Sequence, residues 1–296
     1  MTQKFYKYQG AGNDFLIADN RDGSISEKGG VLICRDSQGN TMEIRISDIC
    51  DRRYGLGADG LMLLEGSNKY DFHMVYFNSD GSGGMMCGNG GRCIVAFAAD
   101  RGITHFDFDA ADGFHTAEIL ADGTSKTVRL KMKDVEDSVR HENLTGPSAA
   151  ADGWFLDTGT RHFVRFVTDL DNYDIVSEGR DIRYNATELM PVGANVNFVE
   201  AFEAGIKVRT YEKGVEDETF ACGTGIVASS VASYLNGILP TQSFDDGRVS
   251  YKVQAVRDQL AVDFIPESQA DFKCADVWLT GPATYVAEII IGNIKK

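Results

Sequence analysis

The stretch that decides the fold covers Cys87–Ala98 and reads CGNGGRCIVAFA. A glycine-rich turn with a thiol at its start leads directly into a run of small and apolar residues. A run that is apolar or small on nearly every side predicts a helix that is buried all round. The first amides of a helix have no partner within it, and the helix dipole favours negative charge there. Cys87 is therefore a candidate thiolate, although a single cysteine is more often a small core residue.

A second copy of this pattern strengthens the functional interpretation. Cys222–Ala228 reads CGTGIVA and again opens an apolar run. The triplets YFN at 76–78 and YEK at 211–213 precede their cysteines by the same number of residues. Further upstream, GAGNDF at 10–15 is loosely echoed by GANVNF at 193–198. Two similar halves, each with a thiol at a helix start, predict one site between the halves.

Length and charge limit the class of protein. A chain of 296 residues is long enough for two domains, each with its own core. The formal charge of −15 argues against nucleic acid or an anionic membrane as a partner. No apolar run reaches the length of a membrane span, and no signal peptide is recognisable at Met1. We therefore expect a cytoplasmic protein, with the oligomeric state left open between monomer and homodimer.

The six cysteines do not indicate a disulfide framework, because a reducing compartment keeps them as thiols. They contain no C-x-x-C pair, and the five histidines lack ligand spacing, so no metal site is predicted. No phosphate loop, no clear dinucleotide fingerprint and no lysine in a phosphate-binding context stand out. The sequence thus predicts no metal, no cofactor and a small molecule as the partner.

Many short strands surround the two predicted helices and favour an α+β fold. Two pseudo-symmetric domains are expected, each a β-barrel-like sheet around a central helix, with the site in the cleft between them. Residues 1–132 with 282–296 would carry Cys87, and residues 133–281 would carry Cys222. The polar segment 133–152 is the best boundary, and a break at Gly281-Pro282 is expected before the last strand. Residues 21–40 are expected to form a surface loop or a short excursion from the domain. The predicted strands are Phe5–Gln9, Phe15–Asp19, Leu61–Leu64, Phe72–Phe77, Phe106–Asp109, His115–Leu120, Thr127–Met132, Trp154–Asp157, Phe163–Val167, Val196–Glu200, Ile206–Tyr211, Tyr251–Val256, Gln259–Val262, Val277–Leu279 and Tyr285–Ile291.

Two thiols without a cofactor suit racemisation or epimerisation. One thiolate removes an α-proton while the opposing thiol delivers a proton from the other face. The α-proton of an amino acid is weakly acidic, so the planar intermediate needs charge stabilisation. Two helix N-termini aimed at the α-carboxylate would supply this with fixed amide donors. The two thiols must share one proton, so their apparent pKa values describe the pair and not either cysteine alone.

Motifs along the whole chain are GAGNDF (10–15), RYGLGADG (53–60), NSDGS (78–82), MCGNGGRC (86–93), GANV (193–196), YEKG (211–214), ETFACGTG (218–225) and LTGPA (279–283). In these motifs the chain resembles the diaminopimelate epimerase family, which belongs to the pyridoxal-independent amino-acid racemases. The resemblance runs nearly the full length, and the motifs are specific only when taken together. The family interconverts LL- and meso-diaminopimelate, on the route to lysine and peptidoglycan.

The resemblance implies a role for individual residues. The two acid–base groups would be Cys87 and Cys222. The α-carboxylate would be held by the amides of Gly88, Asn89, Gly223 and Thr224. The carboxamides of Asn13, Asn78 and Asn195 would hold the amino and distal groups of the substrate, although asparagine beside glycine also suits turns. Glu212 would meet a substrate ammonium group, and His162 would tune the thiols.

Two departures from the family pattern affect recognition of the distal end of the substrate. Thr160 stands where an asparagine is usual, and Lys213 replaces an arginine, which trades a bidentate fork for a point charge. Arg161 would compensate if its guanidinium reached the site. Four alternatives remain: a proline or hydroxyproline racemase type, a two-cysteine racemase acting on another amino acid, a superfamily isomerase with a carboxylate base, and a non-catalytic amino-acid-binding protein.

Overall fold

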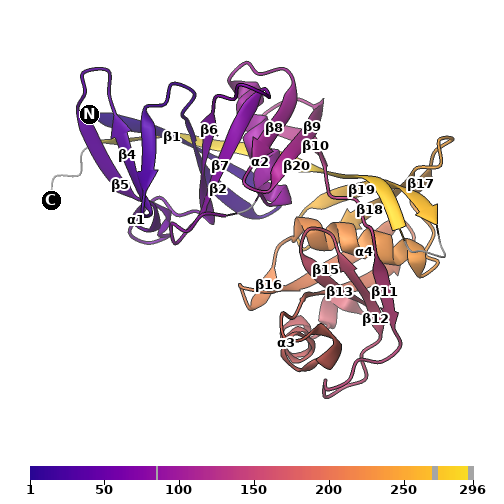
Figure 1. Cartoon of the computed structure of the whole chain (residues 1–296). Helices are drawn as coiled ribbons and strands as arrows, with labels where there is room; N and C mark the ends of the chain where they lie inside the picture. The colour runs from indigo at the N-terminus through magenta and orange to yellow at the C-terminus, as the bar shows by residue number, and fades with distance from the viewer. Residues whose placement is uncertain (85, 269–272, 293–296) are drawn as a thin grey trace. The chain divides into compact units, whose positions relative to one another are not determined.

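A computed structural model describes residues 1–84, 86–268 and 273–292. The chain forms two compact units, Met1–Leu130 with Pro282–Lys296 and Lys131–Gly281. The boundary lies two residues before the one expected between 132 and 133. Each unit contains one long buried helix enclosed by strands (Figure 1).

The first unit is a closed ring of eight strands. These pair in the order β1, β2, β6, β7, β8, β9, β10 and β20, and β20 then pairs with β1. The β2–β6 and β7–β8 pairs are parallel. Helix α2 (Gly88–Asp100) is buried at every residue from Gly88 to Ala98, as the all-round apolar pattern predicts. The strand bounds are β1 (Thr2–Gly10), β2 (Asn13–Asp19), β6 (Gly60–Glu65), β7 (Phe72–Asn78), β8 (Phe106–Ala110), β9 (Gly113–Ala121), β10 (Ser125–Lys131) and β20 (Lys273–Gly292).

The second unit has a similar order of strand pairs, with helix α4 (Gly223–Leu235) as its long helix. Its strands pair in the order β11, β12, β13, β14, β15, β18, β19 and β20, with parallel pairs at β13–β14 and β15–β18. In each unit the long helix comes after the fourth strand in the pairing order, if strands are counted from β1 in the first unit and from β12 in the second. The predicted pseudo-symmetric α+β fold is therefore confirmed. The bounds are β11 (Ser138–His141), β12 (Gly153–Asp157), β13 (Arg161–Phe166), β14 (Asn195–Phe202), β15 (Gly205–Glu212), β16 (Asp217–Thr219), β17 (Gln242–Ser243), β18 (Val249–Gln254) and β19 (Gln259–Ser268).

Both units carry an insertion at the equivalent place, between β2 and β6 in the first unit and between β13 and β14 in the second. The first inserts a three-stranded sheet, β3 (Ile25–Lys28), β4 (Val31–Arg35) and β5 (Thr41–Arg45), and the short helix α1 (Ile46–Cys50). The second inserts helix α3 (Ile175–Asn185), flanked by the 3₁₀ turns η1 (Leu170–Asn172) and η2 (Thr187–Leu189).

Residues 21–40 form a short folded excursion and not a surface loop. β3 and β4 occupy most of it, and their inward side chains join a core that also contains Phe5 of β1. Leu32 and Cys34 are fully buried there. Burial of alternate side chains holds these short strands together.

The expected break at Gly281-Pro282 is also wrong, because β20 runs without interruption from Lys273 to Gly292. Its pairing with β19 ends at Thr280, and its pairing with β1 begins at Thr284. Pro282 falls between these two ladders, so its missing N–H costs neither of them a hydrogen bond.

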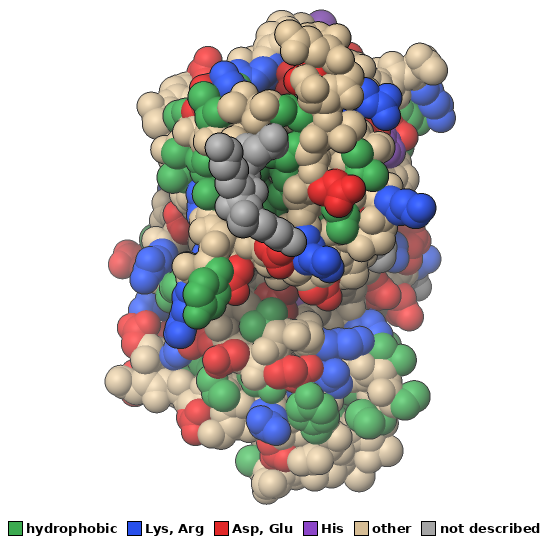
Figure 2. All heavy atoms as spheres, turned by 90° about the vertical axis from the view of Figure 1, so that its left-hand side faces the viewer, with side chains coloured by type: hydrophobic (Ala, Val, Ile, Leu, Met, Phe, Trp, Pro, Cys, Tyr) green, Lys and Arg blue, Asp and Glu red, His purple; other side chains and the backbone are tan. Residues whose placement is uncertain are grey.

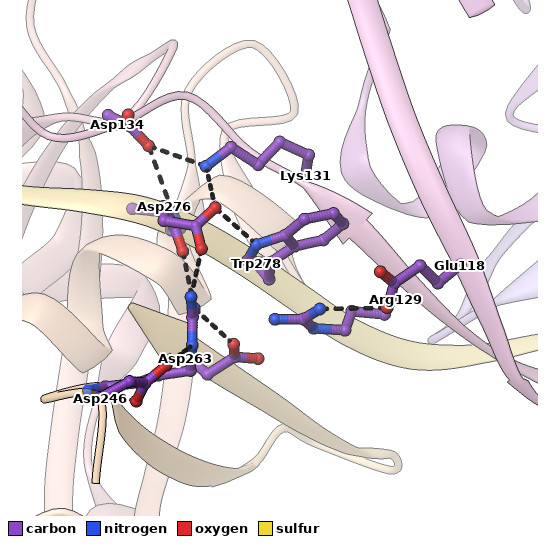
Figure 3. Close-up of polar contacts among 10 residues, drawn as sticks. Glu118, Arg129, Lys131, Asp134, Asp246, Asp263, Asp276 and Trp278 are labelled. Carbon is purple, nitrogen blue, oxygen red and sulfur yellow. Dashed lines mark hydrogen bonds and ion pairs between the residues drawn. The ribbon is translucent and has the colours of Figure 1, made fainter. Parts of the chain in front are cut away.

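A charged cluster holds β20 within the second unit (Figure 3). The Asp276 carboxylate accepts hydrogen bonds from Lys131 Nζ (2.7 Å), from Trp278 Nε1 (2.9 Å) and from the Arg248 guanidinium. Arg248 Nη1 also donates to Asp263 at 3.0 Å. Burial alone would raise the pKa of Asp276, but these donors hold it well below its usual range. Asp276 itself has a left-handed backbone, with φ of 50°.

Acidic and basic side chains are interspersed over the face seen in Figure 2, so the net negative charge is not gathered there in one patch. Among the described residues, no helix is long and apolar enough to span a membrane.

Candidate functional site: two thiol-capped helices

The first thiol caps helix α2. Cys87 has an extended backbone (φ −106°, ψ 150°), and its Sγ accepts a hydrogen bond from the Gly90 amide at 3.2 Å. The Gly91 amide donates to the Cys87 carbonyl at 2.8 Å. The sulfur therefore sits on the first turn with an amide directed at it, a position that stabilises a thiolate. Cys87 is partly exposed.

A chain of side-chain hydrogen bonds orients the asparagines next to this turn. Arg92, fully buried, donates from Nη2 to Asn89 Oδ1 at 2.8 Å. Asn89 Nδ2 donates to Asn13 Oδ1 at 2.7 Å, and Asn13 Nδ2 donates to Asp59 at 2.9 Å. A guanidinium only donates and a carboxylate only accepts, so the two ends fix the direction of both carboxamides. The structure thus brings two of the predicted binding residues into one network.

Asn78 ends β7 in a turn with Ser82. Its Nδ2 donates to Ser82 Oγ at 3.0 Å, and its backbone amide donates to the Ser82 carbonyl at 2.9 Å. A cavity of about 310 Å³ adjoins this turn and is lined by Asp80, Arg52 and Asp59 among others. Asp59 thus both holds Asn13 and lines this cavity. A larger hollow of about 710 Å³ lies beside α3 and is lined by none of the predicted site residues.

The second thiol also stands at the N-cap of its helix, α4, but its sulfur does not make the capping hydrogen bond that the sulfur of Cys87 makes. Cys222 is extended (φ −99°, ψ 110°) and buried. Its carbonyl accepts from the Ile226 amide at 2.8 Å. Its Sγ lies 3.5 Å from the Thr224 hydroxyl, within reach of a hydrogen bond to sulfur. The predicted thiol at a helix start is present in both units.

A buried histidine lies behind Thr224. His162 on β13 is fully buried, and its Nε2 lies 2.9 Å from Thr160 Oγ1 and 3.0 Å from Thr224 Oγ1. The two threonine hydroxyls are themselves 3.0 Å apart. Burial lowers the pKa of His162 to about 3, so the imidazole is neutral at physiological pH. The Thr160 hydroxyl therefore belongs to the His162 cluster.

Asn195 connects the ends of three strands. Its Oδ1 accepts from the Lys213 amide at 2.8 Å, and its Nδ2 donates to the Arg161 carbonyl at 3.1 Å. Glu212, at the end of β15, accepts a hydrogen bond from Thr219 Oγ1 at 2.8 Å. The Lys213 side chain is exposed.

Arg161 lies on the other face of β13 from His162, because neighbouring residues of a strand point to opposite faces. Its guanidinium lies 4.9 Å from the centre of the Phe155 ring. Phe155 packs against the core that α3 covers, whereas His162 faces α4. This placement does not favour the expected role of Arg161 in replacing the family arginine.

Sequence reasoning missed three residues that hold the predicted ones in place. Asn197 contacts His162, Arg92 fixes Asn89, and Asp59 fixes Asn13. A signal for Asn197 existed, since it lies two residues after Asn195 on a strand and therefore shares its face. The partners of Asp59 and Arg92 depend on contacts between distant parts of the chain.

Solved structures share this fold. The chain is similar to a phenazine biosynthesis protein of the PhzF family from Bacillus anthracis, with a TM-score of 0.67 and 14% identity over 98% of this chain and 99% of that one. It is also similar to a probable proline racemase from Agrobacterium radiobacter, with a TM-score of 0.65 and 15% identity over 98% and 92% of the two chains. The chain therefore has the same fold as these proteins.

Sequence comparison identifies the family among proteins of this fold. The diaminopimelate epimerase family model matches residues 5–136 and 154–262. A diaminopimelate epimerase from Flavobacterium psychrophilum is 39% identical over 97% of this chain and 100% of the relative. A diaminopimelate epimerase from Chlorobaculum tepidum is 41% identical over 77% of this chain and 82% of the relative. The chain belongs to the diaminopimelate epimerase family, which confirms the resemblance seen in its motifs.

Proposed function

We propose that this protein epimerises LL-diaminopimelate to meso-diaminopimelate without a cofactor, using Cys87 and Cys222 as its acid–base pair. The observation that carries the proposal is the thiol at the N-cap of the buried helix in each unit of a chain of this family. Binding alone would require neither thiol.

In this mechanism one thiolate removes the α-proton and the other thiol protonates the opposite face of the same carbon. The amides of Gly88, Asn89, Gly223 and Thr224 hold the α-carboxylate and stabilise the charge that develops on the planar intermediate. The resting pair carries one proton in total. The reverse reaction uses the same two groups with their roles exchanged.

The remaining polar groups recognise the two ends of the substrate. Asn13, Asn78 and Asn195 present carboxamides, and Glu212 supplies a carboxylate for an ammonium group. Lys213 supplies positive charge for the distal carboxylate. The product serves lysine and peptidoglycan synthesis, which places the proposed activity in the cytoplasm.

Replacement of each thiol tests the proposal. Cys87→Ala and Cys222→Ala are each expected to lower kcat by about 100- to 10,000-fold, which is the usual contribution of a positioned acid or base. Cys34→Ala is the control, because Cys34 is a buried residue of β4 outside both thiol turns. Chiral chromatography of LL- and meso-diaminopimelate measures turnover, and circular dichroism checks folding. Near-normal turnover by either folded variant would refute the two-base mechanism.

Competing substrates separate the proposal from its alternatives. Proline and hydroxyproline are expected to show no racemisation, because neither offers a second amino-acid head group to the asparagines and Glu212. If the wild-type protein racemises proline or another amino acid faster than it converts diaminopimelate, the substrate assignment fails. Binding of diaminopimelate without turnover would instead indicate a binding protein.

A further inference from the structure

The contacts of Asn197 determine which ring nitrogen of His162 carries the proton. Asn197 Nδ2 lies 3.2 Å from the Phe163 carbonyl and 3.1 Å from His162 Nδ1. Its Oδ1 accepts from the Thr210 hydroxyl at 2.9 Å. A carbonyl oxygen only accepts, so the amino group of Asn197 must face Phe163 and His162. Its second hydrogen points to His162 Nδ1, which must then be the unprotonated nitrogen.

The proton of the neutral imidazole is therefore on Nε2, which faces the two threonines. The Nε2–H group, the Thr160 hydroxyl and the Thr224 hydroxyl together hold three hydrogens. One can lie between His162 and Thr160 and one between Thr160 and Thr224. The third, on Thr224, is left for Cys222 Sγ at 3.5 Å. With the proton on Nδ1 the cluster would hold only two hydrogens, so donation to the sulfur would leave either Nε2 or the contact between the two hydroxyls without a hydrogen.

We propose that Asn197 is a positioning residue that keeps His162 in the Nε2–H form, so that Thr224 donates its hydroxyl hydrogen to the Cys222 thiolate. This role rests on the proposed function of Cys222 as an acid–base thiol. Asn197 does not touch the sulfur. It acts through His162 and the two hydroxyls, and no proton leaves the chain of hydrogen bonds.

The close fit of Asn197 against helix α4 supports a fixed orientation. A Cβ atom on Gly225 would lie only 2.3 Å from Asn197 Oδ1, so glycine is needed where the side chain meets the helix. Thr210 holds the same oxygen from β15. Asn197 is fully buried, and reorientation would leave the Phe163 carbonyl facing an oxygen.

Few charges face this cluster. On β12, the Asp157 carboxylate raises the pKa of His162, but burial outweighs it. On β15, the inward face ends in Glu212, whose carboxylate accepts from Thr219. Arg161 and Arg165 of β13 lie on the opposite face of that strand. Helix α4 carries no charged residue.

Nitrogen NMR of histidine-labelled wild-type protein tests the tautomer directly. The expected spectrum has one histidine with a protonated Nε2 and an unprotonated Nδ1, and this histidine stays neutral at pH 5. His162→Phe assigns this signal by its loss. A wild-type His162 protonated on Nδ1, or on both nitrogens at pH 7, would overturn the proposal without any substitution of Asn197.

The effect on Cys222 is tested by the pH profile of its alkylation with iodoacetamide, read by mass spectrometry of the peptide that contains it. Asn197→Leu is expected to move the midpoint of this profile upward by about one to two pH units, the size expected for loss of one hydrogen bond to a charged group. Ser230→Ala is the control, because it removes another buried hydroxyl of α4 that bonds only its own helix at Ile226. It is expected to leave the midpoint unchanged.

A double-mutant cycle separates positioning from a general structural effect. His162→Phe should shift the midpoint as Asn197→Leu does, and the double variant should shift it no further, because Asn197 acts only through His162. Additive shifts, or an unchanged midpoint in folded Asn197→Leu protein, would overturn the proposal. Alkylation needs no substrate, so the two proposals can fail separately. The positioning role of Asn197 can be refuted while diaminopimelate turnover is observed, and it can be supported when no turnover is observed.

Discussion

Replacement of Gly225 by alanine tests how tightly the second thiol turn is packed. The added Cβ would lie 2.3 Å from Asn197 Oδ1 and 3.3 Å from Cys222 Cβ. Asn197 must then move by about 1 Å to reach ordinary contact, although His162, Phe163 and Thr210 hold it. Overpacking of this kind costs about 1–3 kcal/mol, and each disturbed hydrogen bond costs about 1 kcal/mol. The helix preference for alanine over glycine returns up to about 1 kcal/mol.

The net expectation for Gly225→Ala is a loss of about 1–3 kcal/mol in the free energy of unfolding. Gly90→Ala is the matched control at the equivalent position of α2. Its Cβ would lie 3.3 Å from Cys87 Sγ and 3.6 Å from its next neighbours, so it should be neutral within about 1 kcal/mol. The same substitution in the two copies of one motif should therefore differ by about 2 kcal/mol.

Urea unfolding followed by far-ultraviolet circular dichroism, which reports on both units, suits this comparison, and tryptophan fluorescence reports on the second unit alone. The protein has two tryptophans, Trp154 and Trp278, and both lie in the second unit. Gly225→Ala should lower the midpoint seen by either probe, and Gly90→Ala should leave the circular-dichroism midpoint near the wild-type value. A Gly225→Ala midpoint at or above that of Gly90→Ala would refute the packing argument.

Two further predictions concern pH and charge. Since the pKa of His162 falls from its ordinary value near 6.5 to about 3 on folding, the unfolded chain binds the proton first, and stability is lost as pH falls from 6.5 towards 3. His162→Gln should therefore reduce the stability loss between pH 7 and pH 4 by about 3 kcal/mol in urea titrations, and an unchanged pH dependence would contradict a buried neutral imidazole. Asp276→Asn keeps a side chain that tolerates the left-handed backbone but removes the charge that Lys131 and Arg248 neutralise. It should lower the free energy of unfolding, followed by tryptophan fluorescence at pH 7, by only about 1 kcal/mol, because the carboxylate is 41% exposed and solvent screens it. The difference should vanish in strong acid, where the carboxylate is protonated.

The duplicated framework was readable from the sequence because its signals are local. The two Cys-Gly-x-Gly turns begin helices, and the apolar runs after them are buried. Other elements were missed although their local patterns exist. β4 and β5 alternate buried and exposed residues, and α3 has an N-cap at Asp174 with buried residues at Ile175, Gly179 and Ile182. β3 and β4 are short and are separated by glycines, so this segment resembled a loop in the sequence.

The contacts inside the site could not be predicted because they depend on strand register. Asn197 reaches His162 only because β13 and β14 pair in parallel with His162 opposite Asn195. The same applies to Asn13, whose partner Asp59 precedes β6, the parallel neighbour of β2. Pairing between distant segments fixes these neighbours, and spacing along the chain does not reveal them. The direction in which Arg161 points likewise follows from strand alternation once β13 is known to begin there.

The most direct test of the central claim is the conversion of LL-diaminopimelate in deuterated water during the first turnover. Two opposed thiols require that meso product acquires one deuterium at the inverted α-carbon while recovered substrate carries none, because each face is served by a different base. Mass spectrometry of the separated isomers gives this ratio. Deuterium appearing in recovered substrate as fast as in product would indicate a single base, and product without deuterium would contradict delivery of a solvent-derived proton by a second thiol.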